Sequence, residues 1–436
     1  MSKTSKLLIT CTFLIGIGIT LCIVGFLLGG RVSGIGIGQN GIQIYTWGNS
    51  GREESAPSYE EAEVKLDSYQ NIRMNVAYAN VEIKESDHYG IAYKIAKRTP
   101  ISYEIKDGVL NIDQGNKKNG VSSNFMFFGF SGVRNEYIYD TEFITVYIPK
   151  SAVLGEISIK NDCGDINLSN LEASSLALYN DYGNIGLTSI NTPVISLQIN
   201  SGNLTANNIK ADNFTIVNDY GNVELDRVDA ETLSLEISTG SLDMENISAQ
   251  TVTVTDDYGD VTLDTVNAGS LSLKLNTSDL TLNNITAKSL ISDIDYGSFA
   301  MDQVAIDGDT DITINSGSLK MKEVSTHTLS VINQYGSVIG STLSAGDVNF
   351  TLESGNCEIK DFTFNNCEAS SDYGDVTLHL TVPAADYSYD LYTDYGTIKI
   401  DNQDMGGKYR PISSSDTEKQ IKIGCESGNI KINSPL

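Results

Sequence analysis

Apolar and polar residues alternate along most of the chain in a pattern that returns every 19 residues, and a glycine marks each return. The series is interrupted once by a serine in the glycine position, Ser278, and once by a step of 20 residues that leads to Gly317. Longer steps precede the last two glycines. The residues in the glycine position are Gly164, Gly183, Gly202, Gly221, Gly240, Gly259, Ser278, Gly297, Gly317, Gly336, Gly355, Gly374, Gly396 and Gly428.

The apolar positions predict short strands with one buried face. One repeat carries them at Val223, Leu225, Val228, Leu233 and Leu235, and the same positions are apolar in the other repeats. Alternation with a period of two is typical of strands, and recurrence of the same face predicts coils stacked about 4.8 Å apart. We therefore expect an all-β parallel β-solenoid of about 19-residue coils. Because parallel crossovers are almost always right-handed, we expect a right-handed β-helix.

Two further rows refine this prediction, where a row is the set of residues at the same position in successive repeats. An alanine is frequent nine residues after the glycine, where we expect a tight corner. The residue before the glycine alternates between a tyrosine, as in Tyr182 and Tyr220, and a small residue such as Ser201. Where it is a tyrosine, the residue three before the glycine is usually polar, and otherwise it is Ile or Leu. We interpret this alternation as shared volume at one corner, with successive rings about 9.6 Å apart.

Residues 7–28 form an uncharged apolar run near the N-terminus. As a helix rising about 1.5 Å per residue, this run is long enough to cross a hydrocarbon core of about 30 Å. A cleaved signal peptide would have a shorter apolar core and a small-residue cleavage site, and a lipoprotein signal would have small residues just before Cys22. We therefore predict one retained transmembrane helix, with a short cytoplasmic N-terminus and the solenoid on the extracytoplasmic side.

The solenoid also needs protected ends, because an open strand edge recruits other chains. Before Cys163 the repeat is faint, but residues 72–83 match one coil with Ala79 in the glycine position. We expect the following segments: 1–30, cytoplasmic tail and anchor; 31–61, glycine-rich linker; 62–150, N-terminal β cap; and 151–436, β-solenoid with a polar insertion at 401–420.

The charge of the chain limits its partners. Lys and Arg number 29 against 56 Asp and Glu, which gives a net charge of −27. Nucleic acid and anionic lipid headgroups would be repelled, so we expect no nucleic-acid partner. The expected partners are the cytoplasmic membrane through residues 7–28 and an envelope protein or a glycan.

Acidic residues recur at the turns and allow two interpretations. Asp181 and Asp219 precede tyrosines, and Asp165 and Asp375 follow glycines. Stacked carboxylates can bind Ca²⁺, but Asp and Asn also form turns by bonding nearby backbone, and the closely spaced pattern of a calcium loop is absent. The turn role is favoured, so we predict no metal site and no cofactor.

Cysteine and catalytic chemistry give weak signals. Cys357 and Cys367 both fall in inward rows and could face each other, either as buried free thiols or as a disulfide. β-Helices include enzymes that cleave polysaccharides with paired carboxylates. Here the histidines His88, His327 and His379 are far apart in the sequence, and the acids follow the repeat instead of departing from it. We therefore predict no catalytic residues.

One segment of the cap region stands out by its aromatic content. Residues 125–130 contain Phe125, Phe127, Phe128 and Phe130 within a polar, glycine-containing loop. The loop could fold over the first coils as an apolar plug, because strand ends need cover. Alternatively, the four rings form an exposed patch that meets a partner. They are the only residues for which the sequence suggests an interaction patch.

A family resemblance rests on residues 147–150 (Tyr-Ile-Pro-Lys), residues 155–159 (Gly-Glu-Ile-Ser-Ile), and the repeat of Gly, Asp or Asn, Ile or Val, and Leu. Over about residues 60–436 the chain resembles the bacterial "putative-adhesin" family of β-strand-repeat proteins, a domain of unknown function. The resemblance implies a cell-envelope protein and supplies no catalytic motif.

We therefore expect a membrane-anchored cell-surface protein with a non-catalytic adhesion, scaffold or interaction role. The alternatives are a polysaccharide-acting enzyme on a β-helix scaffold and a regulatory partner of an envelope-stress system.

Overall fold

The computed structural model divides the chain into two compact units, Met1–Ser58 with Asn116–Asp140, and Tyr59–Gly115 with Thr141–Leu436. In the first unit, β1 (Gly34–Gly38) and β2 (Gly41–Tyr45) form an antiparallel pair. All other strands belong to the second unit. The residues that the structure describes are 34–38, 41–45, 58–115, 142–150, 152–410 and 419–435.

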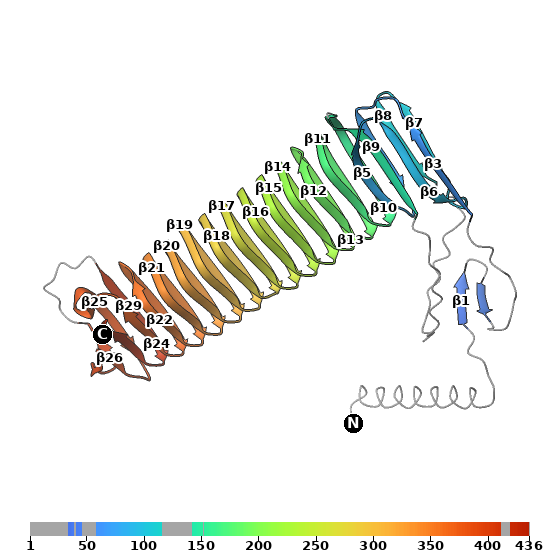
Figure 1. The fold of residues 1–436 in the computed structure, drawn as a ribbon. Coiled ribbons are helices and arrows are strands. Elements are labelled where there is room, and N and C mark those ends of the chain that lie inside the picture. The colour runs from blue at the N-terminus through green and yellow to red at the C-terminus, as the bar shows by residue number, and fades with distance from the viewer. Residues whose placement is uncertain are drawn as a thin grey trace. The chain divides into compact units, whose positions relative to one another are not determined.

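The second unit is a parallel β-solenoid, as the sequence pattern predicts (Figure 1). Each residue pairs in register with the residue 19 positions further along, as Leu204 does with Val223 and Val223 with Leu242. The step of 20 residues appears as a register shift between Ile306 and Asp309. The central strands are β14 (Leu204–Tyr220), β15 (Val223–Thr239), β16 (Leu242–Tyr258), β17 (Val261–Thr277), β18 (Leu280–Tyr296), β19 (Phe299–Ser316), β20 (Leu319–Tyr335) and β21 (Val338–Ser354).

Further strands continue the stack in both directions. They pair in the same parallel register, and all of them except β11, which runs for 17 residues, are shorter than the central strands. These strands are β10 (Leu154–Cys163), β11 (Ile166–Tyr182), β12 (Ile185–Asn191), β13 (Val194–Ser201), β22 (Cys357–Thr363), β23 (Asn366–Tyr373) and β24 (Val376–Leu380).

Each coil has three corners, and the burial pattern locates them. In β14, inward residues alternate from Leu204, but the alternation shifts once before Ile209 and again before Phe214. At the first shift the chain passes through a left-handed residue, such as Asn208 with φ of 57°. The second shift follows Ala211, which agrees with the corner predicted at the alanine row. The turn at the glycine is the third corner.

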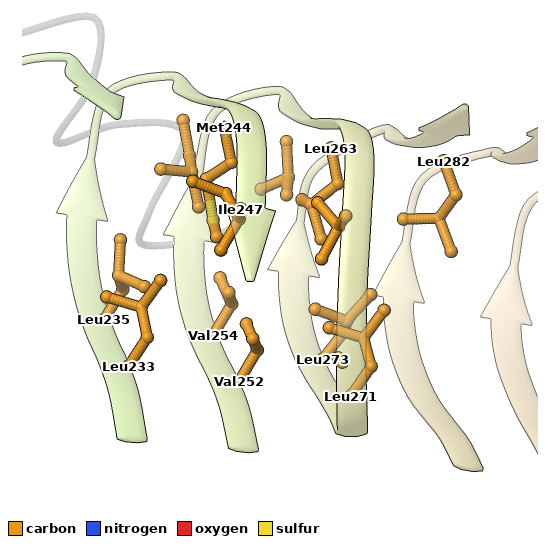
Figure 2. Packing of buried hydrophobic residues seen from close by; sticks show 14 of the residues in the cluster. Leu233, Leu235, Met244, Ile247, Val252, Val254, Leu263, Leu271, Leu273 and Leu282 are labelled. Carbon is orange, nitrogen blue, oxygen red and sulfur yellow. The ribbon is translucent and has the colours of Figure 1, made fainter. Parts of the chain in front are cut away.

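The apolar rows form one continuous core inside the coils. Figure 2 shows inward pairs from successive coils, such as Leu233 with Leu235 and Val252 with Val254, at equivalent places in the stack. Val223 and its row neighbours in the adjacent coils are at most 1 % exposed. Equivalent residues lie above and below one another in the stack, so the core is built coil by coil.

The N-terminal end closes with a change from parallel to antiparallel pairing. β4 (Asn71–Val76) and β5 (Asn80–Ser86) form one coil, and Ala79 occupies the glycine position as predicted. β8 and β9 add to it in parallel, and the outer strands then pair in antiparallel order. This order removes the open parallel edge. The added strands are β3 (Tyr59–Lys65), β6 (Gly90–Ala96), β7 (Ile101–Lys106), β8 (Val109–Gln114) and β9 (Phe143–Pro149).

At the other end the coils do not stack in chain order. β29 (Gln420–Ser427) pairs with β23 on one side and with β25 (Ser388–Thr393) on the other. Likewise β30 (Ile430–Asn433) lies between β24 and β26 (Ile398–Ile400). The coil of Gly428 therefore stands between those of Gly374 and Gly396, so the last coils do not stack in the order of the glycine series.

The outermost coil carries short antiparallel strands. β27 (Gln403–Asp404) pairs with β26, and β28 (Lys408–Tyr409) pairs with β25. Both fall within the polar insertion predicted at 401–420. A short 3-10 helix, η1 (Ala384–Asp386), leads into β25. The edge that would otherwise recruit another chain is thus covered.

No helix among the described residues is both long and apolar enough to cross a membrane. The predicted anchor, residues 7–28, lies outside the described residues, and so do the phenylalanines of the predicted interaction patch.

Candidate functional site

The glycine position is a site of close approach between coils. A Cβ atom on these glycines would lie 1.8–2.2 Å from the backbone carbonyl oxygen of the same position in the adjacent coil. Gly221 also has φ of 139°, a conformation that residues with a side chain rarely adopt. The regular glycine series therefore follows from backbone packing and carries no chemistry of its own.

A buried amide row supports this turn from inside. Asn180 and Asn218, three residues before their glycines, are fully buried. Their Nδ2 atoms donate hydrogen bonds to the carbonyl oxygens of Gly183 and Gly221, at 2.7 and 2.8 Å. In each of these side chains Oδ1 has no hydrogen-bond partner among the described residues. The amides satisfy buried backbone acceptors, which makes their role structural.

A second polar row lies on the outside of the same turn. Asp165 Oδ1 accepts the backbone N–H of Asn184 at 2.8 Å, and Asn184 Oδ1 accepts that of Asn203 at 2.9 Å. Asp375 Oδ1 similarly accepts the N–H of Asn429 at 2.7 Å. Asp165 and Asp375, considered above as calcium ligands, therefore bond backbone, as the turn interpretation expects. Within the described ranges, no group of three or more His, Cys, Asp or Glu side chains could hold a metal ion.

Two adjacent coils depart from the repeat, at two positions that contact each other. Asp256 replaces the buried amide, and Ser278 replaces the glycine of the next coil. Asp256 is 1 % exposed, and its Oδ2 accepts a hydrogen bond from the Ser278 hydroxyl at 2.5 Å. Its Oδ1 has no hydrogen-bond partner among the described residues. Burial raises the pKa of Asp256 to about 6, although the Ser278 hydrogen bond opposes this shift.

We expect Asp256→Asn to stabilise the protein at neutral pH. The folded-state pKa lies above the usual value of 3.8, so the ionised carboxylate costs stability as pH rises from about 4 to about 6. The amide carries no charge and can donate to the Gly259 carbonyl oxygen, as Asn218 does to that of Gly221. The gain should be about 1–2 kcal/mol at pH 8 and smaller at pH 5.

Urea unfolding of both proteins at pH 5 and pH 8 measures this difference. Asp257→Asn removes the same charge from the exposed neighbouring residue and serves as the matched control. An equal gain at both pH values would show that Asp256 does not titrate as described.

The tyrosines before the glycines point outward. Tyr182, Tyr220 and Tyr258 are 65, 63 and 55 % exposed, whereas the amide two residues before Tyr220 is buried. The residues one and three before the glycine therefore do not share volume at one corner, and that part of the interpretation is wrong. The backbone turn at the glycine separates two side chains that strict alternation would place on one side.

The other candidate residues are not brought together. His88 contacts the neighbouring Asp87, and His379 lies near Asn433. Arg227, the one arginine of the regular coils, pairs with Asp226 and donates to Asn207. Within the described residues, these contacts do not join the histidines to one another or to Arg227.

Three of the described cysteines point inward near the C-terminal coils. Cys357, Cys367 and Cys425 are buried free thiols, and Cys163 is an exposed free thiol. Burial raises the pKa of Cys357 and of Cys425 to about 12, so both remain protonated at neutral pH. Cys357 and Cys367 therefore follow the free-thiol alternative of the sequence prediction. Cys425 enters this part of the core through the inserted coil.

Comparison with known proteins gives a family. The model of the Toastrack DUF4097 family matches residues 69–279 and 264–433. The chain belongs to the Toastrack DUF4097 family. This match confirms the predicted resemblance to β-repeat proteins of unknown function. A comparison with curated proteins found no match.

Solved structures with some similarity to this Toastrack chain are also known. One is described as a "putative adhesin" from Bacteroides fragilis, with 15 % identity, a TM-score of 0.28, and coverage of 56 % of this chain and 98 % of that chain. Another is described as a "putative cell adhesion protein" from Clostridium sporogenes, with 10 % identity, a TM-score of 0.14, and coverage of 87 % of this chain and 100 % of that chain.

Proposed function

We propose that the protein is a non-catalytic cell-surface protein with an adhesion, scaffold or interaction role. It is anchored by residues 7–28, and its solenoid lies on the extracytoplasmic side. The observation that carries the proposal is the regularity of the outer surface, where exposed tyrosines recur on alternate coils. Enzyme sites generally depart from the pattern of their scaffold. Here the departure at Asp256 and Ser278 is buried and supports the turn.

Removal of residues 1–30 should move the protein from the membrane fraction to the soluble fraction without changing its β-sheet signal. An uncharged helix of this length anchors a protein effectively irreversibly, whereas the acidic solenoid has no attraction to anionic lipid. Fractionation of cells that express each form, with circular dichroism of the soluble form, measures both effects. A truncated protein that stays in the membrane fraction would contradict the assignment of the anchor.

Cys163 provides a test of orientation. Among the described cysteines it alone is exposed. A membrane-impermeant maleimide should therefore label intact cells that carry the full chain, and Cys163→Ser should abolish that labelling. Labelling that begins only after lysis would place the solenoid on the cytoplasmic side. Turnover of polysaccharides by the purified protein would favour the enzyme alternative.

A further inference from the structure

The exposed tyrosines form a single row along the solenoid, which we call the tyrosine row. Their rings are between 53 and 82 % exposed. Within the described part of the chain, none of them stacks on another ring or a cation, and none forms a side-chain hydrogen bond. No contact among the described residues therefore explains the row. Its members are Tyr78, Tyr182, Tyr220, Tyr258, Tyr296, Tyr335, Tyr373 and Tyr395.

Tyrosines of this row stand on every second coil even where the coils do not stack in sequence order. Tyr373 and Tyr395 precede successive glycines in the sequence, but the coil of Ser427 is inserted between them. Likewise the coil of Cys163 lies between those of Tyr78 and Tyr182. The rings thus stand on every second coil along the stack, about 9.6 Å apart. Crowding explains why no two tyrosines are adjacent, but not why a large exposed ring recurs.

Small residues fill the intervening positions. Most carry a hydroxyl group, and none of these hydroxyls forms a side-chain hydrogen bond among the described residues. The row therefore presents, in alternation, an aromatic face and a free hydroxyl group. The intervening hydroxyl residues are Ser201, Thr239, Thr277, Ser316, Ser354 and Ser427.

The charge beside the row restricts what can bind. A carboxylate precedes most of the tyrosines, as Asp219 precedes Tyr220 and Asp257 precedes Tyr258. The whole chain carries a net charge of −27. Polyanions such as nucleic acids are repelled by such a surface, whereas neutral or amine-bearing polymers are not.

We propose that the tyrosine row binds a linear polysaccharide of neutral or amine-bearing pyranose units that lies along the stack. The apolar face of a pyranose packs on a tyrosine ring, and the ring hydroxyl and the intervening Ser and Thr hydroxyls bond the polar edges of the sugar. The spacing of the rings is comparable to the length of a disaccharide unit in an extended β-linked chain. Individually weak contacts repeated along one polymer give high avidity. This inference rests on the proposed surface role and names its ligand class.

Co-sedimentation with insoluble chitin and chitosan tests the proposal. The full chain is used, in a detergent without a sugar headgroup. We expect it to be retained on at least one of the two polymers. Replacement of Tyr220, Tyr258 and Tyr296 by Ser, the residue of the intervening coils, should weaken retention at least about tenfold because several linked contacts are lost together.

A control variant removes comparable apolar surface elsewhere. Ile291, Ile332 and Ile339 are 52, 43 and 46 % exposed and lie outside the row. Their replacement by Ser should leave retention unchanged. Circular dichroism of both variants checks that the fold is intact.

Three outcomes would overturn the proposal: no retention on either polymer, equal retention of the tyrosine variant, or equal loss in the isoleucine control. A wild-type dimer that the tyrosine variant converts to a monomer in analytical ultracentrifugation would instead assign the row to self-association. None of these results affects the maleimide labelling of Cys163, so failure of this inference is distinct from failure of the proposed surface location.

Discussion

Val223→Asp should destabilise the solenoid by about 4 kcal/mol or more at neutral pH. Val223 is 1 % exposed and stacks between Leu204 and Leu242 in the two adjacent coils. No cation lies in this apolar row to pair with a carboxylate, which must either lose its hydration or take up a proton. The folded-state pKa of the new carboxyl would be raised, so its cost should fall as pH drops towards 5.

Urea unfolding followed by circular dichroism measures this cost. The matched control is Thr215→Asp, which places the same carboxylate on an outward position of the neighbouring coil. We expect the control to change the free energy of unfolding by less than about 0.5 kcal/mol. If the Val223→Asp variant and the wild type have the same free energy of unfolding, the residues of this row do not point inward.

The register of the coils can be predicted from the sequence because the packing at each position of the coil allows only certain residue types. The glycine position lies against a backbone carbonyl in the next coil, and Val223 meets the same row above and below. A shift of one residue would turn every apolar side chain outward. Because these constraints recur in every coil, the pattern can be recognised in the sequence without any long-range information.

The stacking order of the last coils cannot be predicted from that pattern. The coil of Gly428 carries the same apolar rows as the coil of Gly396, so either can stack beside Gly374 in register. Only the linkers and the antiparallel strands that follow β26 distinguish the two orders. A usable signal was the tyrosine alternation, since Ser427 between Tyr373 and Tyr395 restores it.

The direction of the tyrosines also does not follow from the alternation, for a local reason. Positions three and one before the glycine share a side in an extended strand, which suggested that Asn218 and Tyr220 pack together. The turn at Gly221, with φ of 139°, ends this alternation and leaves Tyr220 outside. The alternation does not predict the left-handed corner at Asn208 either, although asparagine favours that conformation and recurs there on alternate coils from Asn170 to Asn284.

A chain that ends at residue 418 should lose the outermost coil and associate with itself. This truncation removes β29 and β30, whose inward side chains Ile421, Ile423 and Ile430 are fully buried. β23 then keeps an open parallel edge, and β25 loses its parallel partner. Isolated short strands are not stable in water, and open edges recruit other chains. We therefore expect lost amide protection in residues 388–400 and concentration-dependent light scattering.

A chain that ends at Ser434 is the matched control, because it removes only the last two residues. It keeps both strands and the contact in which the Ser434 backbone N–H donates to Asp401 Oδ1 at 2.6 Å. Hydrogen exchange in residues 388–400 should match that of the full chain. If the chain that ends at residue 418 keeps the same protection and stays monomeric, β25 packs on β23 once the inserted coil is removed, and the predicted dependence of the outermost coil on β29 and β30 is wrong. If only the chain that ends at residue 418 loses amide protection in residues 388–400, the inserted coil of Gly428 is what keeps the outermost coil on the stack.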